Sequence, residues 1–239
     1  MLFRRLPQQF LHRPQCVFVN LGLVCLVAHK NPSVLSLLPA DARLKIARAD
    51  AIDAYSGLEI ALARLFAQVL GTTPDQAGVV LFRVGNARAR NKMIEHLIKR
   101  KHGPKYNLYW NWLLKFIGQL DQRRNEVVHW HMQIRPNFGR SGNLTSATAS
   151  LVPPNVWDRR RSRQSLNERD LKDFALKCDF AEAAVWFFVF YGEGRLGTRK
   201  MRATWQDIFQ RPLAYPPQDN HPICQRWPKR IVLLAPSRG

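Results

Sequence analysis

The stretch "ADARLKIARADAIDAYSGLEIALARLFAQVLG", residues 40–71, decides the fold of this chain. Its large apolar side chains recur at spacings of three and four residues, which is the period of one face of a helix. The positions are Tyr55, Leu58, Leu62, Leu65, Phe66 and Val69. Gly71 ends the pattern, as glycine commonly does at the C-terminus of a helix. The stretch predicts one long amphipathic helix that needs partner helices to cover its apolar side.

Three further segments have the same periodicity. They are residues 87–101, 106–129 and 167–192. The sequence "GTTPDQAG" (71–78) separates the first of them from the long helix and is interpreted as a break. In the last segment Asn167 is a candidate N-cap, with Asp170 three positions further on. We expect the apolar face of this last helix to close a bundle with the helix at 40–70 and the helix at 106–129.

The composition changes between residues 132 and 165, where Pro, Gly, Ser and Thr accumulate. The sequence "FGRSGN" (138–143) is typical of a turn, and "NLTSATASLV" (143–152) has enough β-branched residues for a short strand. We therefore predict a small β-hairpin inserted between two helices.

The predicted fold class is mainly α, a helical bundle with a small β-hairpin insertion and flexible basic tails. The domain covers residues 39–194, with the hairpin insert at about 132–165. An N-terminal extension, 1–38, precedes it without a defined structural pattern. A basic, proline-rich tail, 195–239, has few periodic apolar positions and is expected to be flexible or loosely docked.

The chain is strongly basic. It has 37 Lys and Arg against 17 Asp and Glu, a net charge of +20 over 239 residues. The tail at 195–239 has nine basic and two acidic residues, a net charge of +7. Such a field favours polyanionic partners, and nucleic acid is the commonest polyanion in a cell.

The four cysteines form no CxxC pair and no recurring spacing, so we expect neither a zinc site nor a disulfide framework. A reducing, cytoplasmic setting fits such cysteines best, and no cofactor is expected. The cysteines are Cys16, Cys25, Cys178 and Cys224. The apolar stretch "CVFVNLGLVCLVAH" (16–29) is too short to span a bilayer, and no membrane association is expected. It is interpreted as a buried strand or docking segment, with two alternatives: a secretion or anchoring signal, or an upstream extension from a wrongly chosen start codon.

The sequence "RRNEVVHWH" (123–131) carries the candidate chemistry, at the end of the predicted helix 106–129. Each residue of a helix advances by about 100°, so Asn125 and His129 share one face and Arg124 lies beside them. Arginine offers a planar fork of donors that matches phosphate oxygens, histidine moves protons near neutral pH, and asparagine can orient either group. The three side chains together are typical of a phosphodiester site.

The motif consists of an Arg, a polar residue, a short spacer and a His, late in an all-helical bundle, and reads Arg124-Asn125-Glu126-Val127-Val128-His129. It resembles the R-x(4–6)-H motif of HEPN (higher eukaryotes and prokaryotes nucleotide-binding) domains. The resemblance covers roughly residues 40–192. It implies a metal-independent endoribonuclease of toxin, phage-defence or RNA-processing type, with Arg124, Asn125 and His129 as catalytic residues. It also implies a homodimer in which two motifs meet, RNA as substrate, and an antitoxin or regulatory protein as a further partner.

Other arginines are expected to hold the RNA backbone. They are Arg123 and, in the "RRRSR" run, Arg159, Arg160, Arg161 and Arg163. Some members of the family have a tyrosine two positions after the histidine, which a partner nucleotidyltransferase modifies. Here His131 takes that position, so such a partner is not expected.

Several alternatives remain open at this point. A second R-x(5)-H run, "RNKMIEH" (90–96), also begins with Arg-Asn, and we prefer the later run because it ends its helix before an irregular segment. Arg124 could instead pair with Asp121 or Glu126 on a solvated face, and His129 could cap the helix. The protein as a whole could be a non-catalytic module that binds nucleotide, RNA or protein, or a scaffold whose basic tails bind.

Two further alternatives concern the residues around the motif. His129 and His131 could form a metal-binding pair, but no cysteine or carboxylate motif accompanies them, so no metal is expected. The tryptophans near the motif could stack on bases, although their helical spacing favours packing in the core. They are Trp110, Trp112 and Trp130.

Overall fold

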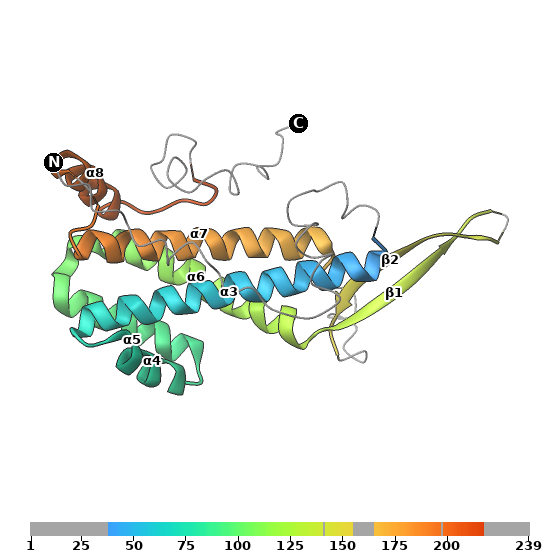
Figure 1. Ribbon diagram of the computed structural model, residues 1–239, viewed down its shortest axis with the longest axis horizontal. Helices are drawn as coiled ribbons and strands as arrows, with labels where there is room; N and C mark the ends of the chain where they lie inside the picture. Colours follow the sequence, from blue (N-terminus) through green and yellow to red (C-terminus); the bar gives the residue numbers. More distant parts are fainter. Residues whose placement is uncertain (1–37, 141, 155–164, 197, 218–239) are drawn as a thin grey trace, which may run out of the picture.

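Two long helices form the spine of the protein. The structure, a computed structural model, describes residues 38–140, 142–154, 165–196 and 198–217. Helix α3 (Ala40–Leu70) and helix α7 (Glu168–Gly192) run side by side in the same direction, and α6 (Asn107–His129) runs antiparallel beside them (Figure 1). The mainly helical class and the bundle of these three helices are confirmed.

The core lies between the apolar faces that the sequence periodicity predicts. In α3, Leu58 and Leu65 are fully buried, and so are Leu113 and Ile117 in α6. Small residues such as Ala51 and Ala61 on α3 let the helix backbones approach closely. Burial of each large apolar side chain stabilises the fold by about 1.5–3 kcal/mol. The bundle therefore depends mainly on these faces.

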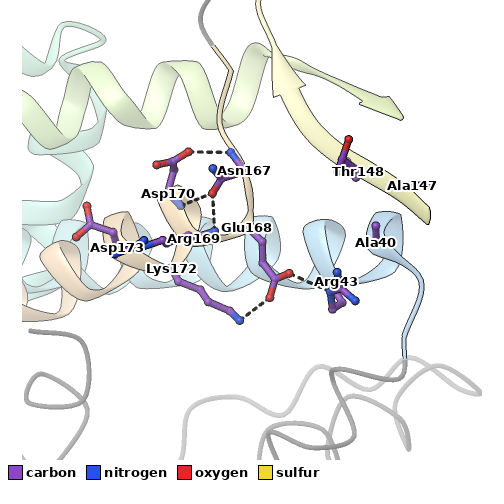
Figure 2. A pocket seen from close by; sticks show the side chains of 11 residues that line it. Ala40, Arg43, Ala147, Thr148, Asn167, Glu168, Arg169, Asp170, Lys172 and Asp173 are labelled. Atoms are coloured by element: carbon purple, nitrogen blue, oxygen red, sulfur yellow. Dashed lines mark hydrogen bonds and ion pairs between the residues drawn. The ribbon is translucent and has the colours of Figure 1, made fainter. Parts of the chain in front are cut away.

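The first turn of α7 is capped as the sequence predicts (Figure 2). The Asn167 side chain accepts hydrogen bonds from the backbone N–H of Arg169 at 2.8 Å and of Asp170 at 3.1 Å. The Asp170 carboxylate accepts one from the Asn167 N–H at 2.9 Å, which completes a capping box. Glu168 then accepts a bond from Arg43 Nε at 3.0 Å, so the start of α7 is tied to the start of α3.

A helix that the sequence interpretation missed, α4 (Pro74–Arg83), follows α3. The Thr73 hydroxyl caps it by accepting from the Gln76 N–H at 3.3 Å, and Pro74 occupies the first turn. The interpretation of 71–78 as only a break was wrong, because Gly71 ends one helix while Thr73-Pro74 begins the next. Ala77 and Leu81 are the buried side chains of this helix.

Helix α5 (Ala87–His102) and α6 form a helical hairpin joined by the 3₁₀ turn η2 (Gly103–Tyr106). The Asn86 side chain caps α5 by accepting from the Ala89 N–H at 3.3 Å. The prediction of a helix at 87–101 is confirmed. Because the connection is short, the start of α5 lies near the end of α6, where the candidate motif is.

The predicted hairpin is also confirmed. Strands β1 (His131–Phe138) and β2 (Leu144–Val152) pair antiparallel, with His131 opposite Val152. Only the base of the hairpin packs on the bundle, through Leu151 and Val152, and the outer part projects from it as an arm (Figure 1).

The C-terminal region is more ordered than the sequence predicts. Helix α8 (Arg199–Phe209) packs on α7, with the Trp205 ring stacked on Phe187 at 4.4 Å between centroids and Phe209 fully buried. Of the two alternatives for the tail, flexible or loosely docked, the flexible one is therefore wrong for 198–217, which packs on α7 through buried aromatic rings. Three buried apolar residues lie four positions apart in this segment: Trp205, Phe209 and Leu213. The surrounding prolines and arginines gave the segment the composition of a flexible tail. The rest of the tail, 218–239, and the extension 1–37 with its apolar stretch 16–29 lie outside the described residues.

Candidate functional site

The predicted arginine lies at the boundary between α6 and α3. The Arg124 guanidinium is over the Tyr55 ring, with 5.7 Å from Cζ to the ring centroid. Its Nη1 is 3.5 Å from Asn125 Oδ1, a long hydrogen bond. A cation–π contact of this kind contributes about 0.5–1 kcal/mol at exposed sites. The contact holds Arg124 loosely and leaves donors free to meet a ligand.

Tyr55 belongs to a polar network that sequence reasoning missed. Its hydroxyl donates to Asp121 Oδ1 at 2.5 Å, and Asn91 Nδ2 donates to Asp121 Oδ2 at 2.8 Å. Burial raises the pKa of Tyr55, and the bond to the Asp121 carboxylate raises it further. The phenol therefore stays protonated and acts as a fixed donor that connects α3 to α6.

The second Arg-Asn pair reaches the same network from α5. Arg90 Nη1 forms an ion pair with Glu59 Oε1 at 2.8 Å, and the two side chains are only 17% and 23% exposed. Burial opposes the charge of Arg90, but the hydrogen bond and the charge of Glu59, together with the electrostatic effects of Tyr55 and Asp121, outweigh it and raise the pKa of the guanidinium. Asn91 thus contacts Asp121 from α5, Arg90 is bonded to Glu59 one turn along α3 from Tyr55, and Arg124 contacts Tyr55 from α6.

A polar cleft of about 1030 Å³ lies between α5 and α6. Asn91, Asp121 and Asn125 line it at the end nearest the motif. Its cationic lining residues are Arg88, Lys92, Lys99 and Lys115. These outnumber the two lining carboxylates, Glu95 and Asp121, so the cleft is positively charged and suits an anionic ligand.

The predicted histidine stands at the end of α6 with its imidazole exposed. In the described part of the chain, no side chain forms a hydrogen bond with His129. Its backbone neighbours are fixed, since Arg48 Nη2 donates to the Val128 carbonyl at 2.6 Å and the Trp130 N–H donates to the Glu126 backbone carbonyl at 2.9 Å. The structure thus brings Arg124 and Asn125 together, and places His129 one helical turn beyond Asn125 without contact to either.

The simpler pairing of Arg124 on a solvated face is not what the structure has. Asp121 bonds to Tyr55 and Asn91, and Glu126 forms an ion pair with the neighbouring Arg123 at 2.6 Å. Arg123, predicted to hold RNA, is therefore engaged by a carboxylate. The other predicted RNA-binding arginines, Arg159, Arg160, Arg161 and Arg163, lie outside the described residues.

The tryptophans pack in the core as their spacing favours. Trp110 is 2% exposed and Trp130 is 9% exposed. Trp112 stacks on Phe116 with 5.0 Å between ring centroids. None of the three rings is presented to the α5–α6 cleft, whose lining does not include them.

A second hollow, of about 880 Å³, lies where the hairpin meets the starts of α3 and α7 (Figure 2). Its charged groups are largely paired with one another: Glu168 accepts from both Arg43 and Lys172, and Asp170 completes the helix cap. The α5–α6 cleft, by contrast, has cations without a carboxylate partner among the described residues, such as Lys92 and Lys115. The cleft is the stronger candidate site.

The residues that sequence reasoning missed gave unequal signals. Asp121 lies four residues before Asn125, so helical spacing alone could have placed it on the same stripe. Tyr55 and Asn91 come from other helices, and nothing in the order of residues links them to the motif. Their role required the packing of α3 and α5 against α6.

Within the ranges described, no group of three or more His, Cys, Asp or Glu could hold a metal ion, and no helix is long and apolar enough to cross a membrane. The Asp121 carboxylate has a phenol and an amide as its partners, and such a group of side chains forms hydrogen bonds rather than a metal-ligand set. No protein-family model, curated protein or solved structure was found to match the chain.

Proposed function

We propose that this protein is a HEPN-like endoribonuclease that cleaves RNA through its own 2′-OH, without a metal ion. The observation that carries the proposal is the arrangement at the end of α6: Arg124 contacts Asn125, Asn125 lines the polar cleft, and His129 is exposed one turn beyond. The positive charge of the cleft and of the chain supports a polyanionic substrate. RNA in the cytoplasm is the substrate that this proposal names.

The proposed step is an in-line transesterification. The ribose 2′-oxygen attacks phosphorus while His129 takes its proton, and the bond from phosphorus to the 5′-oxygen breaks. A second imidazole protonates the leaving 5′-oxygen, which leaves a 2′,3′-cyclic phosphate and a 5′-OH. Arg124 stabilises the charge that develops on the phosphate oxygens, and Asn125 orients Arg124.

One chain presents one such Arg and His at the end of α6, so we propose that a homodimer supplies the second imidazole. An isologous contact would bring two motif ends together. Sedimentation at micromolar concentration is expected to show a dimer. A monomer that still cuts RNA would contradict this part of the proposal.

His131 provides a matched control for the dimer, because it is exposed and only two residues from His129. His129→Ala should abolish cleavage while His131→Ala should leave most of it. If both variants lose activity equally, the second imidazole comes from the same chain.

The central experiment incubates the pure protein with RNA in EDTA, beside the Arg124→Ala/His129→Ala double variant. We expect metal-independent cutting by the wild type alone. An RNA with a single 2′-deoxy nucleotide at the mapped cut site should resist it, and efficient cutting there would exclude the mechanism. Binding without cutting across many RNAs would favour the alternative, a non-catalytic RNA- or nucleotide-binding or protein-interaction module.

A further inference from the structure

A polar stripe runs along α6 and ends at the candidate histidine. Its members are spaced alternately by four and three residues, so they lie on one face of the helix. They are Asn111, Lys115, Gly118, Gln122, Asn125 and His129. With a rise of about 1.5 Å per residue, the stripe is about 27 Å long. All of its members except His129 line the α5–α6 cleft.

The opposite wall, on α5, supplies mainly charge. Arg88 and Lys92 are exposed and have no carboxylate partner among the residues that the structure describes. Of the two carboxylates in the cleft, Glu95 is paired with Lys99, and Asp121 already accepts from Tyr55 and Asn91. The wall therefore presents free cations at a spacing of one helical turn, which suits a chain of phosphates.

The α6 wall supplies amides. Asn111 and Gln122 are exposed, and within the described ranges neither side chain forms a hydrogen bond with another residue. Asn125 keeps its amide N–H donors, because only its Oδ1 is used by Arg124. An amide offers both a donor and an acceptor, which is the pattern needed to pair with the edge of a nucleobase.

Gly118 opens a gap in the middle of this amide wall. A Cβ added there would meet no atom within 4 Å. The neighbouring floor of the cleft is Leu114, which is 9% exposed and apolar. A gap without a side chain, above an apolar floor and between amides, can seat a flat aromatic ring.

We infer that the α5–α6 cleft binds single-stranded RNA, with phosphates on Arg88 and Lys92, base edges on Asn111 and Gln122, and one base over Gly118. The inference rests on the proposed function, because the stripe leads to His129. A single strand is required, because in an A-form duplex the Watson–Crick edges are already paired and the major groove is too deep and narrow for side chains to read. The amides thus determine which sequences reach the motif.

Two kinds of variant separate the two walls, in a His129→Ala background that leaves the RNA intact. Binding of short single-stranded RNAs of defined sequence is measured at several salt concentrations. Lys92→Ala should lower the slope of log K against log salt by about 0.7 and weaken all sequences alike. Gln122→Leu should leave the slope unchanged and reduce the preference between sequences. The inference is overturned if Gln122→Leu weakens every sequence equally or has no effect.

Gly118 gives a matched pair of variants that keep the charge. Gly118→Ala adds one methyl group into open space and should change RNA affinity by less than about twofold, while Gly118→Phe fills the gap and should lower it at least tenfold. Circular dichroism verifies that both are folded. Equal affinity of the Phe and Ala variants, or tighter binding of duplex than of single-stranded RNA, contradicts the inference.

These outcomes are independent of the chemistry. If the wild type cuts no RNA but the cleft variants behave as described, the proposed nuclease activity fails and the RNA-reading cleft stands. If the wild type cuts RNA and the cleft variants bind as it does, only the cleft inference fails.

Discussion

The chain contains two Arg-Asn pairs, at 90–91 and 124–125, and the structure uses them differently. Arg90 is held in an ion pair with Glu59 and its side chain is 17% exposed, and Asn91 donates to Asp121. Arg124 rests on the Tyr55 ring, and Asn125 is exposed on the wall of the cleft. The first pair is committed to holding α5 on α3 and α6, and the second keeps donors for a ligand. A dipeptide is therefore assigned to structure or function by its neighbours.

The largest expected effect is on RNA cleavage and concerns the pair at 124–125, whose donors are available to a ligand. Arg124→Lys should lower RNA cleavage at least about 100-fold, because an ammonium cannot reproduce the bidentate fork of a guanidinium. Arg123→Lys is the matched control, since that arginine is adjacent but already paired with Glu126. It should keep most of the activity in the same gel assay. Equal losses in both variants would remove the distinction between them.

Substitution in the pair at 90–91 should affect the stability of the fold rather than RNA cleavage. Arg90→Ala leaves the Glu59 carboxylate without its partner in a mostly buried position, and should lower the free energy of unfolding by about 1–3 kcal/mol. Arg100→Ala, on the exposed side of the same helix, should change it by less than about 0.5 kcal/mol. Urea unfolding followed by circular dichroism measures both. A stable Arg90→Ala protein would show that the ion pair does not hold α5.

Tyr55 connects the two pairs, and Tyr55→Phe should give a smaller loss of about 1–2 kcal/mol by removing the bond to Asp121. The effect should also depend on pH. Because the folded pKa of Tyr55 lies above its ordinary value of 10.0, the contribution of the phenol is complete below pH about 10 and is lost as the pH rises further. Unfolding free energies measured from pH 8 to 11 should therefore fall less steeply for Tyr55→Phe than for the wild type. Parallel curves would contradict this assignment.

The smallest effect is expected from the charge of the C-terminal segment 218–239. Residues 218–239 contain four basic and one acidic residue, a net charge of +3. Truncation after residue 217 removes four basic residues and should reduce the salt slope of RNA binding by at most about 3, at about 0.7 for each phosphate contact, and leave the fold intact. Truncation after residue 194 would instead remove Trp205 and Phe209 from the core, and each lost aromatic ring costs about 3–5 kcal/mol. An unchanged slope in the shorter truncation would exclude this segment from RNA binding.

The sequence predicted the parts of the fold that repeat a period or a cap. The stripe from Tyr55 to Val69 and the Asn167 cap placed α3 and α7 correctly, because these signals are local. Helix α4 was missed because its start signal overlaps the end signal of α3. Helix α8 was missed because it is short and its apolar positions, Met201, Trp205, Ile208 and Phe209, lie in a segment rich in arginine and proline.

The candidate site was only half accessible from the sequence. Arg124, Asn125 and His129 lie close together along the chain, so their common position could be predicted. Tyr55 and Asn91 join them only through tertiary packing, which no spacing in the sequence reveals. The same packing shows that the Arg-Asn pair at 90–91 belongs to the same neighbourhood.

The fixed backbone on both sides of His129 has a consequence for the entropy of binding. The Val128 carbonyl is held by Arg48, and the Trp130 ring is buried. The imidazole can therefore rotate only about its two side-chain torsions, while its point of attachment stays in place. When a partner contacts the imidazole, the backbone around His129 loses little conformational entropy, because no loop has to become ordered. The end of α6 thus presents the exposed His129 side chain on a fixed backbone.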